Sequence, residues 1–359
     1  MRSSHLDVNF TKEKPKGFPW VGVVALLVAG TLLYRFASDG KGFDFSRFTG
    51  TLKNLDPLFS ALAIFFIILS YVGRAVRWEV MMRPLVAAQG ARIGFPKMLS
   101  ATLIGFTAVV LLGRAGEFVR PWLIAKGSKT SFPAQMAIWF FERIYDLLVV
   151  IIFFGYGLVY LSGSERVRSV GKELAWVVAS GGWAALVGGS VCLCFIFALR
   201  FLSAEQRLRL TGLIEHLPAA LAGKLKPLAG NFLEGAAASC DGRLQGKVFT
   251  YTFLEWVIIA ACQWAVFQAF PVTRGLGWSD VVTIVGLVSF GAVVQLPGIG
   301  GGMQVAAIAV LTQLFAVGLE EATSIALVLW VCSFVLVVPV GVWLALKEGL
   351  RFGQMGRLQ

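Results

Sequence analysis

Long apolar runs constrain the fold of this chain more than any other feature of its sequence. Several of them exceed the roughly 20 residues that an α-helix needs to cross a bilayer. Of the 359 residues, 57% are hydrophobic and only 14% are charged. The hydrocarbon core offers no water to backbone N–H and C=O groups, so each crossing segment must satisfy them internally as a helix. The sequence therefore predicts an all-α, polytopic integral membrane protein.

We expect about six full spans and two re-entrant helical hairpins in an inverted arrangement. The predicted spans are Trp20–Phe36, Leu58–Gly73, Pro133–Leu161, Leu174–Leu199, Val248–Phe270 and Ala322–Leu346. Two further apolar stretches are interrupted by glycine and proline and are short of a full crossing on either side of the interruption. They are Met98–Leu112, which ends in a break at Gly113–Pro121, and Val281–Leu296, which runs into a break at Pro297–Gly302 before Met303–Val317. Each predicts a hairpin that returns to the face it entered from.

The same pattern gives the domain organisation. Residues 1–19 are predicted to be a cytoplasmic tail, 20–346 a single transmembrane domain and 347–359 a second cytoplasmic tail. The domain divides into halves 20–199 and 248–346, joined by a cytoplasmic connector, 200–247, whose leucines repeat every three or four residues as in an amphipathic helix. Interrupted helices at corresponding positions of two halves are typical of transporters with a site at the repeat interface. Residues 41–57 fit either a short surface helix or a loop.

Basic residues predict the orientation. Of the 32 Lys and Arg, 21 fall on the proposed cytoplasmic side, eight outside and three within apolar segments. Arg74 and Arg77 are counted with a cytoplasmic loop after the second span. The positive-inside rule then places both termini in the cytoplasm. Since it also explains the net charge of +12, no nucleic-acid partner is predicted.

Seven ionisable side chains fall inside apolar segments. Each costs about 2.5–3.5 kcal/mol near the bilayer centre, so seven left bare would cost on the order of 20 kcal/mol, more than the roughly 5–15 kcal/mol by which a protein is stable. They must pair with one another or line a wet cavity. The predicted substrate-binding residues are these seven, a neighbouring tyrosine and two glutamines beside the second break: Arg114, Glu117, Arg120, Glu142, Arg143, Asp146 and Glu255, with Tyr145, Gln295 and Gln304.

The first break combines a flexible backbone with two arginines. Gly113 and Gly116 permit a tight turn, and Arg114 and Arg120 lie in the same stretch. Such a turn directs free N–H groups and two guanidiniums at one place, which suits a phosphate group. Glu117 would pair with one of the arginines and so keep the phosphate from binding too tightly to be released.

The helix after this break carries two carboxylates on one face. Glu142 and Asp146 are four residues apart and are predicted to face the arginines of the break. Arg143 points about 100° away, so we expect it to pair with Glu117 or Glu255. Glu255 is predicted either to join the site or to extend toward the cytoplasmic surface. The alternative for the whole set is a buried salt-bridge network that only locks the hairpin to its neighbours.

The second break is predicted to be either a bent hinge or a simple turn between helices. It lacks the Lys and Ser/Thr of a P-loop, which argues against a nucleotide site. The predicted hinge residues of the two breaks are Gly113, Gly116, Pro297, Gly298, Gly300 and Gly301. The chain has only two histidines, His5 and His216, both in polar surroundings, so neither a metal site nor another cofactor is predicted.

At Gly113–Glu117, Glu142–Asp146 and Pro297–Gly300 the chain resembles the flippase-like membrane domain family. This family comprises the membrane region of bacterial lysylphosphatidylglycerol synthase/flippase proteins and stand-alone relatives, and the resemblance extends from about Leu58 to Leu346. It implies a multi-pass protein of a bacterial or archaeal cytoplasmic membrane that moves polar or glycosylated lipids, with the charged motifs in a central cavity. This sequence departs from the family at Gln304, near which members commonly carry an acidic residue.

Three function classes follow from the charged residues and the resemblance. The first is a transporter or flippase for a lipid with an anionic or glycosylated headgroup, which would need no catalytic residue. The second is a membrane-embedded lipid-modifying transferase that uses Glu142 or Asp146 as a general base. The third is a non-catalytic scaffold for lipid glycosyltransferases. All three predict membrane lipid as a partner, and the last adds a lipid-biosynthetic enzyme.

Overall fold

A computed structural model of the protein describes residues 43–90, 93–162, 187–191, 194, 242–292, 295–296 and 300–349. The predicted first span, both tails and most of the predicted span at 174–199 and of the connector lie outside the described residues. From Asp44 onward the chain forms one unit, which is helical apart from two strands of two residues each.

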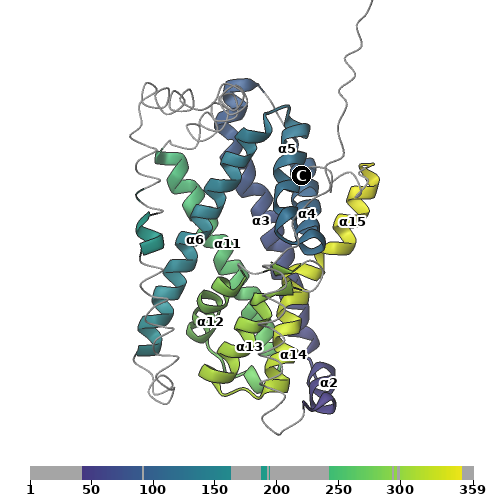
Figure 1. The fold of residues 1–359 in the computed structure, drawn as a ribbon, viewed down its shortest axis with the longest axis vertical. Helices are drawn as coiled ribbons and strands as arrows, with labels where there is room; N and C mark the ends of the chain where they lie inside the picture. The colour runs from purple at the N-terminus through teal and green to yellow at the C-terminus, as the bar shows by residue number, and fades with distance from the viewer. Residues whose placement is uncertain are drawn as a thin grey trace, which may run out of the picture. The chain divides into compact units, whose positions relative to one another are not determined.

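The helices and strands of this unit follow one another with short connections (Figure 1). They are α2 (Phe45–Lys53), α3 (Pro57–Gln89), α4 (Phe95–Leu112), the 3₁₀ turn η1 (Gly113–Phe118), α5 (Val119–Ser128), α6 (Phe132–Ser162), α11 (Gly242–Ala269), η3 (Pro271–Thr273), α12 (Trp278–Gly291), β1 (Gln295–Leu296), β2 (Gly300–Gly301), α13 (Gly302–Phe315), α14 (Leu319–Trp330), the π-helical turn η4 (Val331–Val335) and α15 (Val337–Lys347).

Five segments within the described residues are long and apolar enough to cross a membrane. They are Pro57–Ala87, Phe95–Ser128, Phe132–Leu161, Arg243–Ala269 and Leu319–Lys347. The helices α12 and α13 are apolar but shorter. The chain is therefore an integral, multi-pass membrane protein, and the count of six spans stays a prediction.

The second of these segments reverses direction at η1, so α4 and α5 form an antiparallel hairpin. A Cβ atom added to Gly105 would lie 2.6 Å from the Cβ of Arg120, and one added to Gly116 would overlap the backbone of Ala108. In a straight helix, residues 105 and 120 would lie about 22 Å apart along the axis. The sequence correctly placed a helix, a break and a returning helix at this point. That both ends of the hairpin meet the same membrane face stays a prediction.

The second break also reverses the chain, and it does so through a small antiparallel ladder. Gln295 pairs with Gly301 and Leu296 with Gly300, after which α13 packs against α12. Gly301 has φ 140°, a conformation that residues with a side chain rarely adopt. The Gln304 side chain accepts a hydrogen bond from the Gly301 N–H at 2.7 Å and so caps the start of α13.

The helix α3 is much longer than the predicted span Leu58–Gly73. Its start is capped by Asp56, whose carboxylate accepts the Leu58 N–H at 3.0 Å, and it continues to Gln89. The prediction that Arg74 and Arg77 belong to a cytoplasmic loop is therefore wrong. Both lie within α3, because a second apolar section follows them. Trp78, Val80, Met81, Met82 and Leu85 of that section are each at most 2% exposed.

Of the two readings of residues 41–57, the structure has the short surface helix. Asp44 caps α2 by accepting the Ser46 N–H at 2.9 Å, and α2 has no buried residue. It packs on α14, where Arg47 forms an ion pair with Glu321 at 2.8 Å.

Two apolar clusters hold the helices together, and the hairpin tips lie between them. One cluster joins α3, α4, α5 and α6, and the other joins α3 and α11 to the second hairpin and α14. Among the described elements, α11 packs along α3, α12 on α6 and α15 on α4. The tip of the first hairpin, η1, contacts β1 at the tip of the second. This meeting point, flanked by α3, α6 and α11, positions the charged residues.

Candidate functional site

Arg77 is the centre of the charged cluster. Its side chain is fully buried on α3. One terminal nitrogen donates to Glu142 Oε1 at 2.6 Å, and the other donates to Asp146 Oδ1 at 2.7 Å and to Thr252 Oγ1 at 3.2 Å. Glu255 Oε2 lies 3.3 Å from the same guanidinium. A single arginine from α3 thus joins three carboxylates from α6 and α11.

Glu142 also binds the arginine of the first hairpin. Its second carboxylate oxygen accepts a hydrogen bond from Arg120 and another from Arg143 at 3.1 Å. The Arg120 guanidinium lies over the Trp78 ring, 4.0 Å from its centroid, a cation–π contact that helps to keep this charge inside the protein. Glu142 therefore faces Arg120 as predicted.

Arg143 does not pair with Glu117 or Glu255, and that prediction is wrong. It bonds instead to carboxylates of its own helix, Glu142 and, at 3.2 Å, Asp146. The long side chain bends back along α6 rather than following the direction of its Cβ. The Arg143 side chain is 35% exposed, so it forms part of the wet side of the cluster.

Glu255 does not extend toward a membrane surface. It is 2% exposed and lies 3.1 Å from Arg74 and 3.3 Å from Arg77. Because α11 begins at Gly242 rather than at Val248, Glu255 lies more than three turns inside the helix. The alternative that it joins the charged cluster is the one the structure has.

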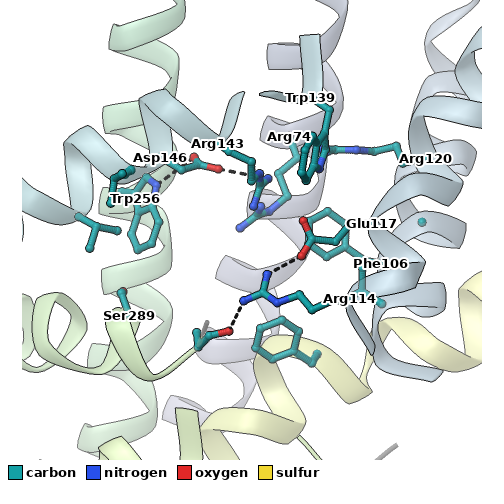
Figure 2. Close-up of a pocket in the computed structure, with 16 residues that line it drawn as sticks. Arg74, Phe106, Arg114, Glu117, Arg120, Trp139, Arg143, Asp146, Trp256 and Ser289 are labelled. Carbon is teal, nitrogen blue, oxygen red and sulfur yellow. Dashed lines mark hydrogen bonds and ion pairs between the residues drawn. The ribbon is translucent and has the colours of Figure 1, made fainter. Parts of the chain in front are cut away.

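Arg114 links the tips of the two hairpins. Its guanidinium forms an ion pair with Glu117 and donates to the Ala292 carbonyl of the second hairpin at 2.7 Å. Figure 2 shows this side chain between the two partners. The Arg114 side chain is 47% exposed and that of Glu117 is 13% exposed. The contact is therefore one that solvent or a ligand can reach.

A cavity of about 300 Å³ lies where the two hairpins, α3, α6 and α11 meet (Figure 2). Four arginines and two carboxylates line it: Arg74, Arg114, Arg120, Arg143, Glu117 and Asp146. Aromatic rings form much of the remaining wall, namely Phe106, Trp139, Trp256 and Phe334. The Trp256 indole N–H donates to Asp146 at 3.1 Å and so fixes the direction of that carboxylate.

The charges around the cavity favour an anion. Four guanidiniums against two carboxylates leave the lining positive, and a positive cleft with low-dielectric walls concentrates negative ligands. The Nη1 atom of Arg120 is buried and has no hydrogen-bond partner among the described residues. Bidentate arginine contacts are the usual means of holding a phosphate. The arrangement can therefore bind and release an anionic group, and its aromatic walls suit an apolar or sugar-like neighbour of that group.

Three predicted binding residues have other surroundings. Tyr145 is 5% exposed and packs in an apolar cluster. Gln304 caps α13, and the backbone of Gln295 belongs to β1. Of the predicted hinge residues, Gly113 ends α4 with φ 65° and Gly301 has φ 140°, whereas Pro297 and Gly298 lie outside the described residues.

Sequence reasoning missed two arginines and the aromatic wall. Arg74 and Arg77 are three residues apart and therefore on one face of α3. Arg74 lines the cavity and lies 4.7 Å from the Phe106 ring centroid. The signal that was present is the apolar section after them, which shows that a helix passes through both arginines instead of ending before them.

Comparison with known proteins agrees with the helical architecture. A segment of 139 residues is 28% identical to a protein described as glycosyltransferase AglD from Haloferax volcanii. The match covers 38% of this chain and only 22% of that protein's length. A family model described as the lysylphosphatidylglycerol synthase TM region matches residues 22–341, a range that contains the charged cluster and both hairpins. The chain belongs to the family of the lysylphosphatidylglycerol synthase transmembrane region.

Proposed function

We propose that this protein moves a lipid with an anionic polar headgroup across the membrane. The headgroup passes through the arginine-lined cavity between the two hairpins while the lipid tails stay in the bilayer. The observation that carries the proposal is the set of four arginines around this cavity. Their burial in an apolar protein is too costly to be explained by stability alone.

The contacts of Arg114 suggest how binding and release are linked. A phosphate bound to this guanidinium competes with Glu117 and with the Ala292 carbonyl. Loss of the Ala292 contact frees the tip of the first hairpin from the second. Glu117 takes the guanidinium back when the headgroup leaves, so neither charge is left bare. A loaded cavity therefore favours separation of the hairpin tips, and an empty one favours their contact.

The surroundings of the carboxylates argue against the transferase alternative. Glu142 is fully buried and holds three arginines, and it is not among the residues that line the cavity. Asp146 accepts hydrogen bonds from Arg77 and from the Trp256 indole. A general base needs a free lone pair within reach of its substrate. The partial likeness to a protein described as a glycosyltransferase is compatible with a lipid-linked sugar or phosphate as cargo.

Lipid redistribution in vesicles tests the proposal. Purified protein is reconstituted with labelled phosphatidylglycerol, and the fraction of label in each leaflet is followed with a membrane-impermeant quencher. We expect redistribution faster than in empty vesicles. Arg114→Ala should slow it about tenfold or more, because a charge-assisted hydrogen bond contributes roughly 1.5–3 kcal/mol.

Arg274→Ala is the matched control for this experiment. Arg274 is half exposed and pairs with Asp56 at 2.9 Å, and it is not among the residues that line the cavity. Its removal should leave the rate within about twofold of wild type, as expected for an exposed ion pair. Redistribution by wild type no faster than in empty vesicles would show that the protein is not a transporter for this lipid class.

A further inference from the structure

We infer that the headgroup site has a second compartment, around Gln263, that accepts a hydroxyl group of the headgroup and excludes a cationic one. The inference rests on the proposed function, because it names the class of headgroup that the same site takes. It predicts a lipid with a phosphodiester and a polyol, such as a glycerol or a sugar.

The second compartment is a cavity of about 110 Å³ that adjoins the arginine-lined one. The two cavities share part of their walls: Arg74, Phe106, Trp256, Ser289, Ala292 and Phe334. Gln263 lies on α11 two helical turns beyond Trp256, about 10 Å along the axis. A ligand that reaches both compartments is therefore longer than a phosphate group alone. The remaining wall is mostly aliphatic and aromatic.

Gln263 presents an unused acceptor in this compartment. The residue is 6% exposed, and its Oε1 atom has no hydrogen-bond partner among the described residues. The hydroxyls nearby are already committed. That of Tyr71 donates to the Ser333 carbonyl at 2.8 Å, and that of Ser289 donates to the Val285 carbonyl at 2.6 Å. A buried acceptor without a donor costs about 1–3 kcal/mol, and a ligand hydroxyl that donates to it removes this cost.

The charges favour a hydroxyl over an ammonium group as the donor. Arg74 lines the second compartment, and no carboxylate is among the described residues that line it. An ammonium group bound to Gln263 would share the compartment with the Arg74 guanidinium and would have no counterion there. Two like charges close together in a low-dielectric site repel strongly. The compartment therefore selects an uncharged donor attached to an anionic phosphodiester.

Binding of a matched series of lipids to the purified protein tests this inference. Dissociation constants are measured in detergent by native mass spectrometry. Phosphatidylmethanol has the phosphodiester alone, phosphatidylglycerol adds hydroxyls, phosphatidylinositol presents them on a ring, and phosphatidylethanolamine presents an ammonium group. We expect at least one of the two polyol lipids to bind about tenfold more tightly than phosphatidylmethanol, and phosphatidylethanolamine to bind most weakly. The tighter of the two polyol lipids identifies an open-chain or a ring headgroup.

Two variants separate recognition from a structural role of Gln263. Gln263→Met should abolish the advantage of the polyol lipid and leave the affinity for phosphatidylmethanol unchanged. Gln263→Glu should improve binding of phosphatidylethanolamine. Equal affinity of wild type for phosphatidylmethanol and both polyol lipids would overturn the inference, and so would an equal loss for all lipids in Gln263→Met.

These measurements need no transport. A polyol preference without lipid redistribution in vesicles would support the second compartment and contradict the proposed function. Redistribution without a polyol preference would do the reverse. The wild-type series stands even where a variant does not fold.

Discussion

Replacing Arg77 with methionine is expected to lower the free energy of unfolding by about 3–5 kcal/mol, the usual cost of removing one partner of a buried ion pair. Arg77 is fully buried and lies within 3.3 Å of three carboxylates, those of Glu142, Asp146 and Glu255. Methionine fills a similar volume, so the loss comes from charges left without a counterion rather than from a cavity. Chemical unfolding of the purified protein in detergent measures the change.

Arg83→Met is the control, because Arg83 lies on the same helix and is exposed. Its unfolding free energy should stay within about 0.5 kcal/mol of wild type. Arg77→Lys should rescue little, since one ammonium group cannot reproduce the two separate nitrogens that bind Glu142 and Asp146. If Arg77→Met were as stable as Arg83→Met, the carboxylates would have to be neutral or balanced by other groups.

The need for Arg77 was present in the sequence as an imbalance of charge. The seven ionisable residues found inside apolar segments comprise three arginines and four carboxylates. A buried cluster with one excess negative charge is costly, so at least one more cation had to come from a neighbouring helix. The run of basic residues after Gly73 concealed it, because the positive-inside rule treats every arginine that follows a span as part of a loop.

The breaks in the chain were predictable, but the contacts at their ends were not. Glycines at 113 and 116 allow only a few local conformations, so the reversal after α4 follows from the sequence. The pairing of Arg143 does not, because helical geometry fixes only the direction of its Cβ, and several rotatable bonds let the guanidinium return to Asp146. The β1–β2 ladder depends on backbone pairing across the second break, for which glycine-rich sequence has no local preference.

Gly116→Ala is expected to prevent the first hairpin from closing. An added Cβ at this position would overlap the backbone carbonyl of Ala108 and the backbone N of Val109. Overpacking against side chains costs about 1–3 kcal/mol. Here the obstacle is the backbone of a packed helix, which cannot move aside as a flexible side chain can, so we expect a loss of about 3 kcal/mol or more. Melting temperatures of the purified variants provide the measurement.

Gly155→Ala is the matched substitution in an open position, since a Cβ at Gly155 meets nothing within 4 Å. Alanine is favoured over glycine inside a helix by about 1 kcal/mol, so this variant should melt at or above the wild-type temperature. The two substitutions are chemically identical, and opposite signs would isolate the close approach of η1 to α4 as the cause. Because Arg114 lies in η1 and Arg120 follows in α5, Gly116→Ala should also displace two arginines from the cavity and abolish lipid redistribution. A Gly116→Ala protein that melts and transports like wild type would mean that η1 does not lie against Ala108.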